Sequence, residues 1–150
     1  MDKLIKILPP PEFPQKTGDK EQWGKFFGAL GTELPTDYVK FMGIYGTGGI
    51  DNFLWILTPF VNDENVNYLG RQKEMTDSYI QSKKNFPQYY KHDVYPSSGG
   101  IHESRSPENY TYSLTMVEFL YQIITKELIC NAFPDDFPSD ETTFVSVNVE

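Results

Sequence analysis

The segment 102–106 holds the residue types that nucleophilic catalysis uses: a histidine, a carboxylate, an arginine and two hydroxyls. If this segment is extended, His102 and Ser104 share a face, because side chains alternate along a strand. A catalytic triad, however, is assembled from separate parts of a fold, so neighbours in sequence do not make one. The only cysteine, Cys130, follows an apolar helix end and has no basic neighbour, which favours a buried structural thiol. We therefore predict that the protein is not an enzyme and has no catalytic residue.

No metal or cofactor is predicted either. Two histidines, His92 and His102, and one cysteine are too few for a structural zinc site. The acidic residues of the segment 135–141 do not have the spacing of a calcium loop, and a solvated acidic loop explains them more simply. No pair of carboxylates is singled out for glycoside chemistry. The glycines of 46–49 resemble a phosphate loop, but the lysine is missing and the segment follows a helical pattern.

The charge of the chain points to a protein partner. With 21 acidic and 13 basic residues the net charge is −8, which disfavours binding to nucleic acid or to an anionic membrane. The same charge attracts a basic protein surface, although an acid excess that only maintains solubility explains it equally well. The acidic residues that we expect to contact a partner are Asp51, Asp63, Glu64, Asp135, Asp136, Asp140 and Glu141.

Size and composition indicate one folded domain over residues 1–150. The hydrophobic share of 39% and the aromatic share of 15% suffice for a core that is rich in rings. A single cysteine excludes an intrachain disulfide, and no apolar run approaches the roughly 20 residues of a membrane span. The first apolar run is also too short for a signal peptide. We expect a cytoplasmic protein.

Helices are predicted along most of the chain. Residues 1–18 are expected to form an N-terminal arm on the surface, because three prolines follow a short apolar run. Asp19 and Gly31 bracket a first helix as its N-cap and its C-terminal stop. A second helix begins near Pro35, a weaker pattern covers 62–86, and the capping-box pair Thr115 and Glu118 opens the last helix. The apolar stripes expected on these helices are Trp23, Phe26, Phe27 and Leu30, then Tyr38, Phe41, Met42 and Tyr45, and last Val117, Leu120, Tyr121 and Ile124.

Few strands are predicted. The segment 53–57 is apolar throughout and reads as a strand buried on both faces. The segment 144–149 alternates, with Val145, Val147 and Val149 on its buried side. A weak strand is expected near 101–104, and the glycines of 46–49 are expected to form a turn. Two confident strands are marginal for a sheet in water.

The residues from Leu30 to Phe60 resemble the N-terminal signature of the SUKH superfamily (Smi/Knr-like domains). The matching residues, to which we assign structural roles, are Leu34, Pro35, Tyr38, Tyr45, Gly46, Gly48, Trp55 and Pro59. Farther along, the segment 103–107, the helix that contains Glu118 and the segment 133–137 are also similar to that family. Relatives of this type carry further strands that are absent here between Gly100 and Ile101, through a natural deletion or through loss of a segment from the sequence.

The resemblance implies an α+β fold in which a mixed twisted sheet is flanked by helices. It also implies an immunity protein that binds and neutralises the cognate toxin of a polymorphic toxin system, often a nuclease or a deaminase. The alternative is a non-catalytic regulatory binding module of the cell-wall-regulator type, with Tyr89, Tyr90 and Tyr95 as anchors. A hydrolase would require His102 and Ser104, or clustered acids, to converge in a pocket.

Overall fold

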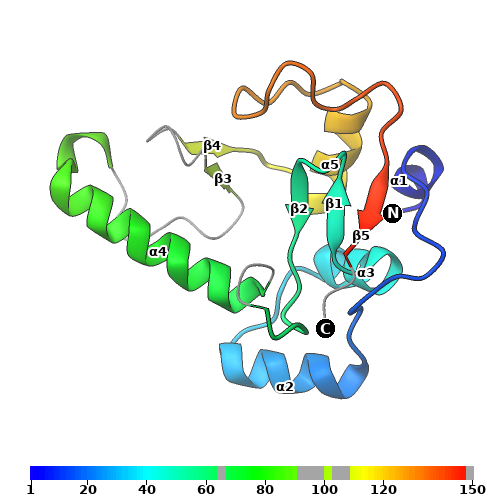
Figure 1. The fold of residues 1–150 in the computed structure, drawn as a ribbon, viewed down its shortest axis with the longest axis horizontal. Coiled ribbons are helices and arrows are strands. Elements are labelled where there is room, and N and C mark those ends of the chain that lie inside the picture. Colours follow the sequence, from blue (N-terminus) through cyan, green and yellow to red (C-terminus); the bar gives the residue numbers. More distant parts are fainter. Residues whose placement is uncertain (64–66, 91–99, 103–108, 148–150) are drawn as a thin grey trace.

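The computed structural model describes residues 1–63, 67–90, 100–102 and 109–147. Helices and strands alternate irregularly along the chain (Figure 1), which confirms the predicted α+β class. The elements are α1 Asp2–Ile7, α2 Lys20–Leu30, α3 Thr36–Tyr45, β1 Gly48–Ile50, β2 Leu54–Ile56, α4 Tyr68–Asn85, the 3-10 helix η1 Pro87–Tyr89, β3 Gly100–His102, β4 Asn109–Thr111, α5 Met116–Ile124 and β5 Phe144–Ser146.

The main sheet is antiparallel and has the strand order β2-β1-β5. Its central strand is formed by Gly48, Gly49 and Ile50. The turn predicted for 46–49 is therefore confined to Gly46, which has a φ of 67°, and Thr47. For Gly48 and Gly49 the predicted turn is wrong, because both pair with β2 on one side and β5 on the other. The packing there is close, since a Cβ on Gly48 would lie 2.4 Å from the carbonyl oxygen of Val145. Two isolated parallel bridges, between Gln15 and Gly46 and between Thr58 and Asn67, lie outside the strands in the described part of the chain.

A second, two-stranded sheet pairs β3 with β4. It bears out the weak strand near 101–104 over residues 100–102. Gly100 and Ile101, between which the family resemblance expects more strands, are consecutive residues of β3. Residues 103–108 lie outside the described part of the chain, and so does the proposed cluster of Glu103, Ser104, Arg105 and Ser106.

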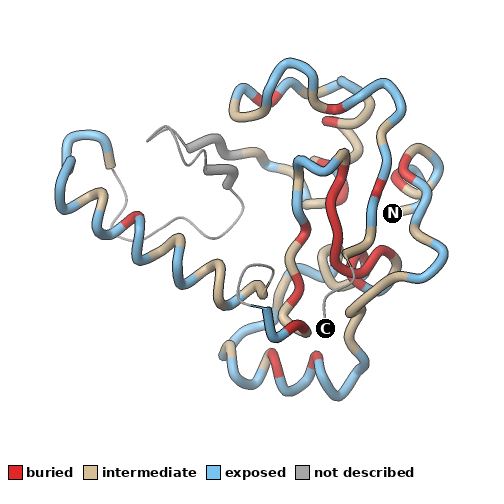
Figure 2. The backbone as a smooth tube through the Cα atoms, viewed as in Figure 1, coloured by how far each residue is buried: buried red, intermediate tan, exposed pale blue. Residues whose placement is uncertain are grey.

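One cluster of buried side chains joins one face of the main sheet to the helices α1, α2, α3 and α5. Figure 2 shows β1 as a buried run between β2 and β5. Within this core the rings of Phe41 and Tyr45 stack at a centroid distance of 4.4 Å, and Phe144 contacts both. The buried residues are Leu4, Leu8, Trp23, Phe26, Phe41, Met42, Tyr45, Ile50, Ile56, Val117, Leu120 and Phe144.

The predicted surface arm is wrong for its first residues, which form α1. Leu4 and Leu8 are four positions apart and fall on one side of this helix, where both are completely buried. The hydroxyl of Tyr45 donates a hydrogen bond of 2.6 Å to the carbonyl oxygen of Leu8. The prolines that follow end the helix but do not keep it out of the core.

The ends of α2 and the start of α5 agree with the predictions. Asp19 caps α2 in a reciprocal pair with Gln22, and Gly31 ends it with a φ of 74°. Thr115 and Glu118 form the expected capping box at the start of α5. Helix α4 is shorter than predicted and begins after Asn67, whose side chain accepts a hydrogen bond from the backbone N–H of Gly70. In the described part of the chain, no helix is both long and apolar enough to cross a membrane.

Candidate partner-binding surface

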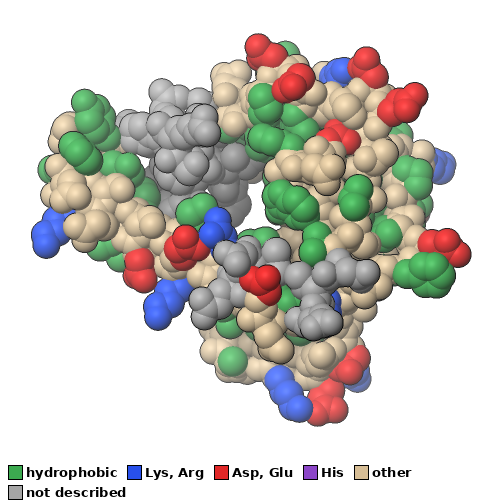
Figure 3. Space-filling model, in the orientation of Figure 1, with side chains coloured by type: hydrophobic (Ala, Val, Ile, Leu, Met, Phe, Trp, Pro, Cys, Tyr) green, Lys and Arg blue, Asp and Glu red, His purple; other side chains and the backbone are tan. Residues whose placement is uncertain are grey.

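One face of the main sheet is open. Trp55 of β2 and Val145 of β5 are both directly opposite Gly49 of β1, so all three residues lie on the same face. Trp55 is 45% exposed and Val145 is 46% exposed. Figure 3 shows hydrophobic side chains gathered over these strands. An exposed tryptophan beside an exposed valine on the same face of a sheet is a surface that a protein partner could cover.

The ring of Trp55 has its place because Gly49 carries no side chain. A Cβ on Gly49 would lie 3.2 Å from two atoms of the Trp55 ring, so the ring covers the space that a side chain would take. An aromatic ring that covers a cross-strand glycine is held in one orientation. The expectation that the segment 53–57 is buried on both faces is wrong, since Trp55 faces solvent and Phe53 is 42% exposed.

The alternation predicted for β5 is out of phase. Val145 was expected on the buried side, but Phe144 is buried and Val145 faces outward. The aromatic contacts of Phe144 with Phe41 and Tyr45 place its ring in the core, and the pleat then turns Val145 to the other face. Val147 is half-buried, and Val149 lies outside the described residues.

The hairpin between β1 and β2 adds a third exposed hydrophobic residue, Phe53. Asp51 and Asn52 form the tip of this hairpin with φ values of 51° and 53°. Two positive φ values in succession are typical of the tight turns that match the twist of a hairpin. Beyond the tip, Phe53 packs against Phe133 and Phe137 at centroid distances of 5.6 and 4.7 Å. These rings attach the loop before β5 to the edge of the open face.

The same loop is held by hydrogen bonds to Asp51. The two carboxylate oxygens of Asp51 accept one bond each, from the backbone N–H of Ser139 at 2.9 Å and from that of Thr143 at 2.8 Å. Its carboxylate therefore stabilises the fold by joining the hairpin tip to the loop. As a candidate partner contact, Asp51 is better explained by this structural role.

The loop presents acidic side chains next to the open face. Asp135, Asp136 and Glu141 are exposed. Asp140 forms a 2.9 Å ion pair with Lys126, and this hydrogen bond lowers the pKa of its carboxyl group. Figure 3 shows acidic side chains along the corresponding edge of the molecule. The result is an apolar face with negative charge on one border.

The other two candidate acids are not part of this arrangement. Asp63 is exposed and precedes α4, on a different part of the chain from the acidic loop. Glu64 lies outside the described residues. The structure thus brings together five of the seven acids that the sequence suggested, with Asp51 beneath the loop and the other four on it.

Most of the signature residues hold the fold. Tyr38 donates a hydrogen bond of 2.6 Å to the carbonyl oxygen of Leu57, and burial raises its pKa well above the ordinary value. A Cβ on Gly46 would lie 2.1 Å from the carbonyl oxygen of Gln15. Leu34 packs on the core, while Pro35 is exposed at the start of α3 and Pro59 is half-buried. Trp55 is the exception, because its ring lies on the surface.

The described residues offer little for catalysis. Among them, no group of three histidine, cysteine or acidic side chains could hold a metal ion. The thiol of Cys130 is buried. His92 lies outside the described residues, and only the backbone of His102 is described.

Three exposed residues of this surface, Phe53, Trp55 and Val145, were not among the partner contacts that the sequence suggested, and Trp55 was assigned a structural role instead. For Val145 the sequence held a usable signal in Phe144, the residue before it. Burial of the larger Phe144 ring stabilises the fold more than burial of a valine, so Phe144 should face the core and Val145 the solvent. The surface combines exposed hydrophobic side chains with exposed acidic side chains on one border.

No protein-family model, curated protein or solved structure matches this chain.

Proposed function

We propose that this protein is an immunity protein that binds and neutralises a cognate toxin domain by covering a basic surface of it. The observation that carries this proposal is the open sheet face of Trp55 and Val145, bordered by the acidic loop. The net charge of −8 and the resemblance of residues 30–60 to SUKH proteins support it as well. The protein acts by occlusion and catalyses no reaction.

The apolar part of the surface supplies affinity. Tryptophan is enriched among the few residues that dominate binding at interfaces, especially near the centre of an interface. Trp55 is held over Gly49 before any partner arrives, so little side-chain freedom is lost on binding. Phe53 and Val145 extend the same apolar area on either side.

The acidic border supplies steering. Nucleases and deaminases bind a phosphate backbone through basic side chains, and acidic side chains on an inhibitor attract the same groups. Asp135, Asp136 and Glu141 are exposed on the loop that Asp51 holds against the hairpin. Rim charges of this kind mainly raise the association rate, so the affinity falls as salt rises.

The test is co-purification with the toxin encoded beside the gene, followed by titration at low and high salt. We expect a one-to-one complex, loss of toxin activity, and weaker binding in high salt. Trp55→Ala is expected to weaken binding by 30-fold or more, since hot-spot truncations cost about 2 kcal/mol or more. Phe13→Ala removes another exposed ring, outside the sheet, and serves as the matched control.

The double variant Asp135→Asn with Asp136→Asn separates charge from apolar contact. It is expected to slow association and to flatten the salt dependence, while the dissociation rate changes little. The control for net charge is the double variant Asp77→Asn with Glu12→Gln, which removes the same two charges at exposed positions outside the loop. A toxin that stays active in an excess of this protein would rule out the immunity function.

The alternative is a regulatory module that binds a host protein. A specific observation favours it: Phe86 is 54% and Tyr89 is 57% exposed at the end of α4 and in η1, and Ile80 of α4 is also exposed. Tyr90 contacts Tyr79, whereas Tyr95 lies outside the described residues. A gene that stands alone, without a neighbouring toxin gene, and a partner lost on Tyr89→Ala but not on Trp55→Ala would support this module.

A further inference from the structure

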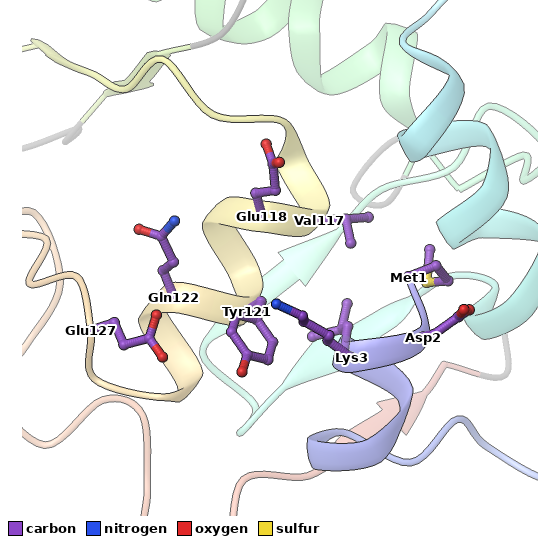
Figure 4. Close-up of a pocket in the computed structure, with 9 residues that line it drawn as sticks. Met1, Asp2, Lys3, Val117, Glu118, Tyr121, Gln122 and Glu127 are labelled. Carbon is purple, nitrogen blue, oxygen red and sulfur yellow. The ribbon is translucent and has the colours of Figure 1, made fainter.

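A groove between α1 and α5 is formed by residues other than those of the open sheet face. Its volume is about 500 Å³, and its walls come from both helices and from the turn after α5. Figure 4 shows Glu118, Tyr121 and Gln122 along α5, with Glu127 following from the turn. From α1, the side chain of Lys3 extends toward Tyr121.

This groove already receives a cation. The Nζ atom of Lys3 lies 5.7 Å from the centroid of the Tyr121 ring, which is the range of a cation–π contact. Within the described part of the chain Lys3 forms no ion pair, so the ring is the partner of its ammonium group. Lys3 is exposed and belongs to a helix of six residues, so its side chain can move into water at little cost.

The α5 wall of the groove is negative. Glu118 and Glu127 are exposed, and α5 with its following turn contributes no basic side chain to the lining. Hydrogen bonds from Thr115 lower the pKa of Glu118, and the amino group of Met1 contributes in the same direction. Asp2 points away from Tyr121 (Figure 4). Glu127 belongs to the same wall as the ring, whereas the carboxylate of Glu118 points away from Tyr121 (Figure 4) and accepts the backbone N–H of Thr115. Among the described residues that line the groove, Lys3 has the one basic side chain.

We propose that this groove receives an arginine side chain of the partner protein, which stacks on Tyr121 in place of Lys3. Arginine fits better than lysine because its planar guanidinium group stacks on an aromatic ring and still has donors for the Glu127 carboxylate on the same wall. The inference rests on the proposed function in one respect, that the partner is a basic protein. Lys3 is then an internal competitor that keeps the ring covered until the arginine arrives.

A peptide experiment tests the groove without the toxin. The full chain is titrated with acetyl-Ala-Arg-Ala-amide and followed by NMR, with the citrulline peptide as the uncharged control of the same shape. We expect shifts of Tyr121, Gln122 and Glu127 with a millimolar Kd for arginine, and none for citrulline. Equal shifts with both peptides, or arginine shifts that avoid these residues, would overturn the proposal.

Variants of Lys3 and Tyr121 make the test specific. Lys3→Ala is expected to tighten arginine binding about threefold, because the competitor is gone. Lys6→Ala removes the same charge from an exposed position of α1 outside the groove. Its effect on the Kd is expected to be less than half of the effect of Lys3→Ala. Equal effects of the two variants would show attraction by net charge alone and would contradict the proposal.

Removal of the ring is expected to weaken binding about fivefold. Tyr121→Leu keeps an apolar side chain of similar bulk on this half-buried position, whereas Tyr121→Phe keeps the ring and is expected to bind as the wild type. If the toxin complex forms and both variants bind the toxin and the arginine peptide equally well, the groove proposal fails while the immunity function stands. If no toxin complex forms, the peptide result still decides the groove.

Discussion

The carboxylate of Asp51 accepts a hydrogen bond from the backbone N–H of Thr143 at 2.8 Å, across 92 positions of the chain. Its second oxygen accepts the N–H of Ser139 at 2.9 Å. One side chain at a hairpin tip thus fixes the loop that carries the exposed acids and the start of the edge strand β5. The geometry of the candidate surface depends on these two hydrogen bonds of Asp51.

Replacing Asp51 should therefore destabilise the fold. Asp51→Gly keeps the positive φ of the tip but removes both acceptors, and we expect a loss of about 2 kcal/mol in the free energy of unfolding. Asp51→Asn retains one acceptor oxygen and should lose about half of that. Urea unfolding measures both values. Asp135→Asn, on the exposed loop, should stay within about 0.5 kcal/mol of wild type, and a similar result for Asp51→Gly would contradict the structural role.

The buried hydroxyl of Tyr45 predicts a loss of stability in alkali. Burial raises the pKa of Tyr45 to about 12, compared with about 10 in the unfolded chain. Between these values the unfolded chain releases a proton that the folded protein retains, so stability falls as the pH rises. The contribution of Tyr45 to this slope is about 1.4 kcal/mol per pH unit. Below pH 10 its contribution to stability is fully present.

The variant Tyr45→Phe isolates this effect. It should be less stable at neutral pH by about 1–2 kcal/mol, because the carbonyl of Leu8 loses its donor in the core. Between pH 10 and 12 its stability should fall less steeply than that of the wild type. Tyr89→Phe, at a largely exposed ring, is the control and should keep the wild-type slope. Parallel pH profiles of Tyr45→Phe and wild type would refute the assignment.

Two glycine-to-alanine changes should have opposite signs. On Gly48 a Cβ would meet the carbonyl oxygen of Val145 at 2.4 Å and the ring of Phe144 at 2.6 Å, so Gly48→Ala should cost about 3 kcal/mol or prevent folding. On Gly43 of α3 a Cβ meets nothing within 4 Å, and Gly43→Ala should stabilise by about 0.5–1 kcal/mol. Thermal unfolding of both variants decides. A stable Gly48→Ala protein would contradict the central position of β1.

The first helix should be required for folding. Leu4→Ala removes a completely buried side chain, and core truncations of this kind cost about 2–5 kcal/mol. Lys6→Ala changes an exposed residue of the same helix and should alter the unfolding midpoint little. Denaturant unfolding of the pair gives the comparison. If Leu4→Ala were as stable as Lys6→Ala, residues 2–7 would belong to a surface arm after all.

The sequence by itself determined α2, α3 and α5 and the caps of α2 and α5, but not α1 or the start of α4. The caps Asp19, Gly31 and the pair Thr115 and Glu118 act within one turn of the chain, and each is found where the local pattern predicts it. The buried sides of α2, α3 and α5 follow in the same way, since residues three and four apart share one face of a helix. The acidic loop was also recognised, because its charge is a property of composition.

Only the tertiary structure decided the sheet and the candidate surface. Gly48 and Gly49 become part of a central strand because β2 and β5 pair with them on both sides. The residues next to them in the sequence do not predict that pairing. Period-two alternation cannot tell which face of β5 is covered, and the contact of Phe144 with Tyr45 settles it. The exposure of Trp55 and the role of Asp51 follow from the same long-range pairings. Helix signals are local, whereas the faces of a sheet are assigned by residues that meet only after folding.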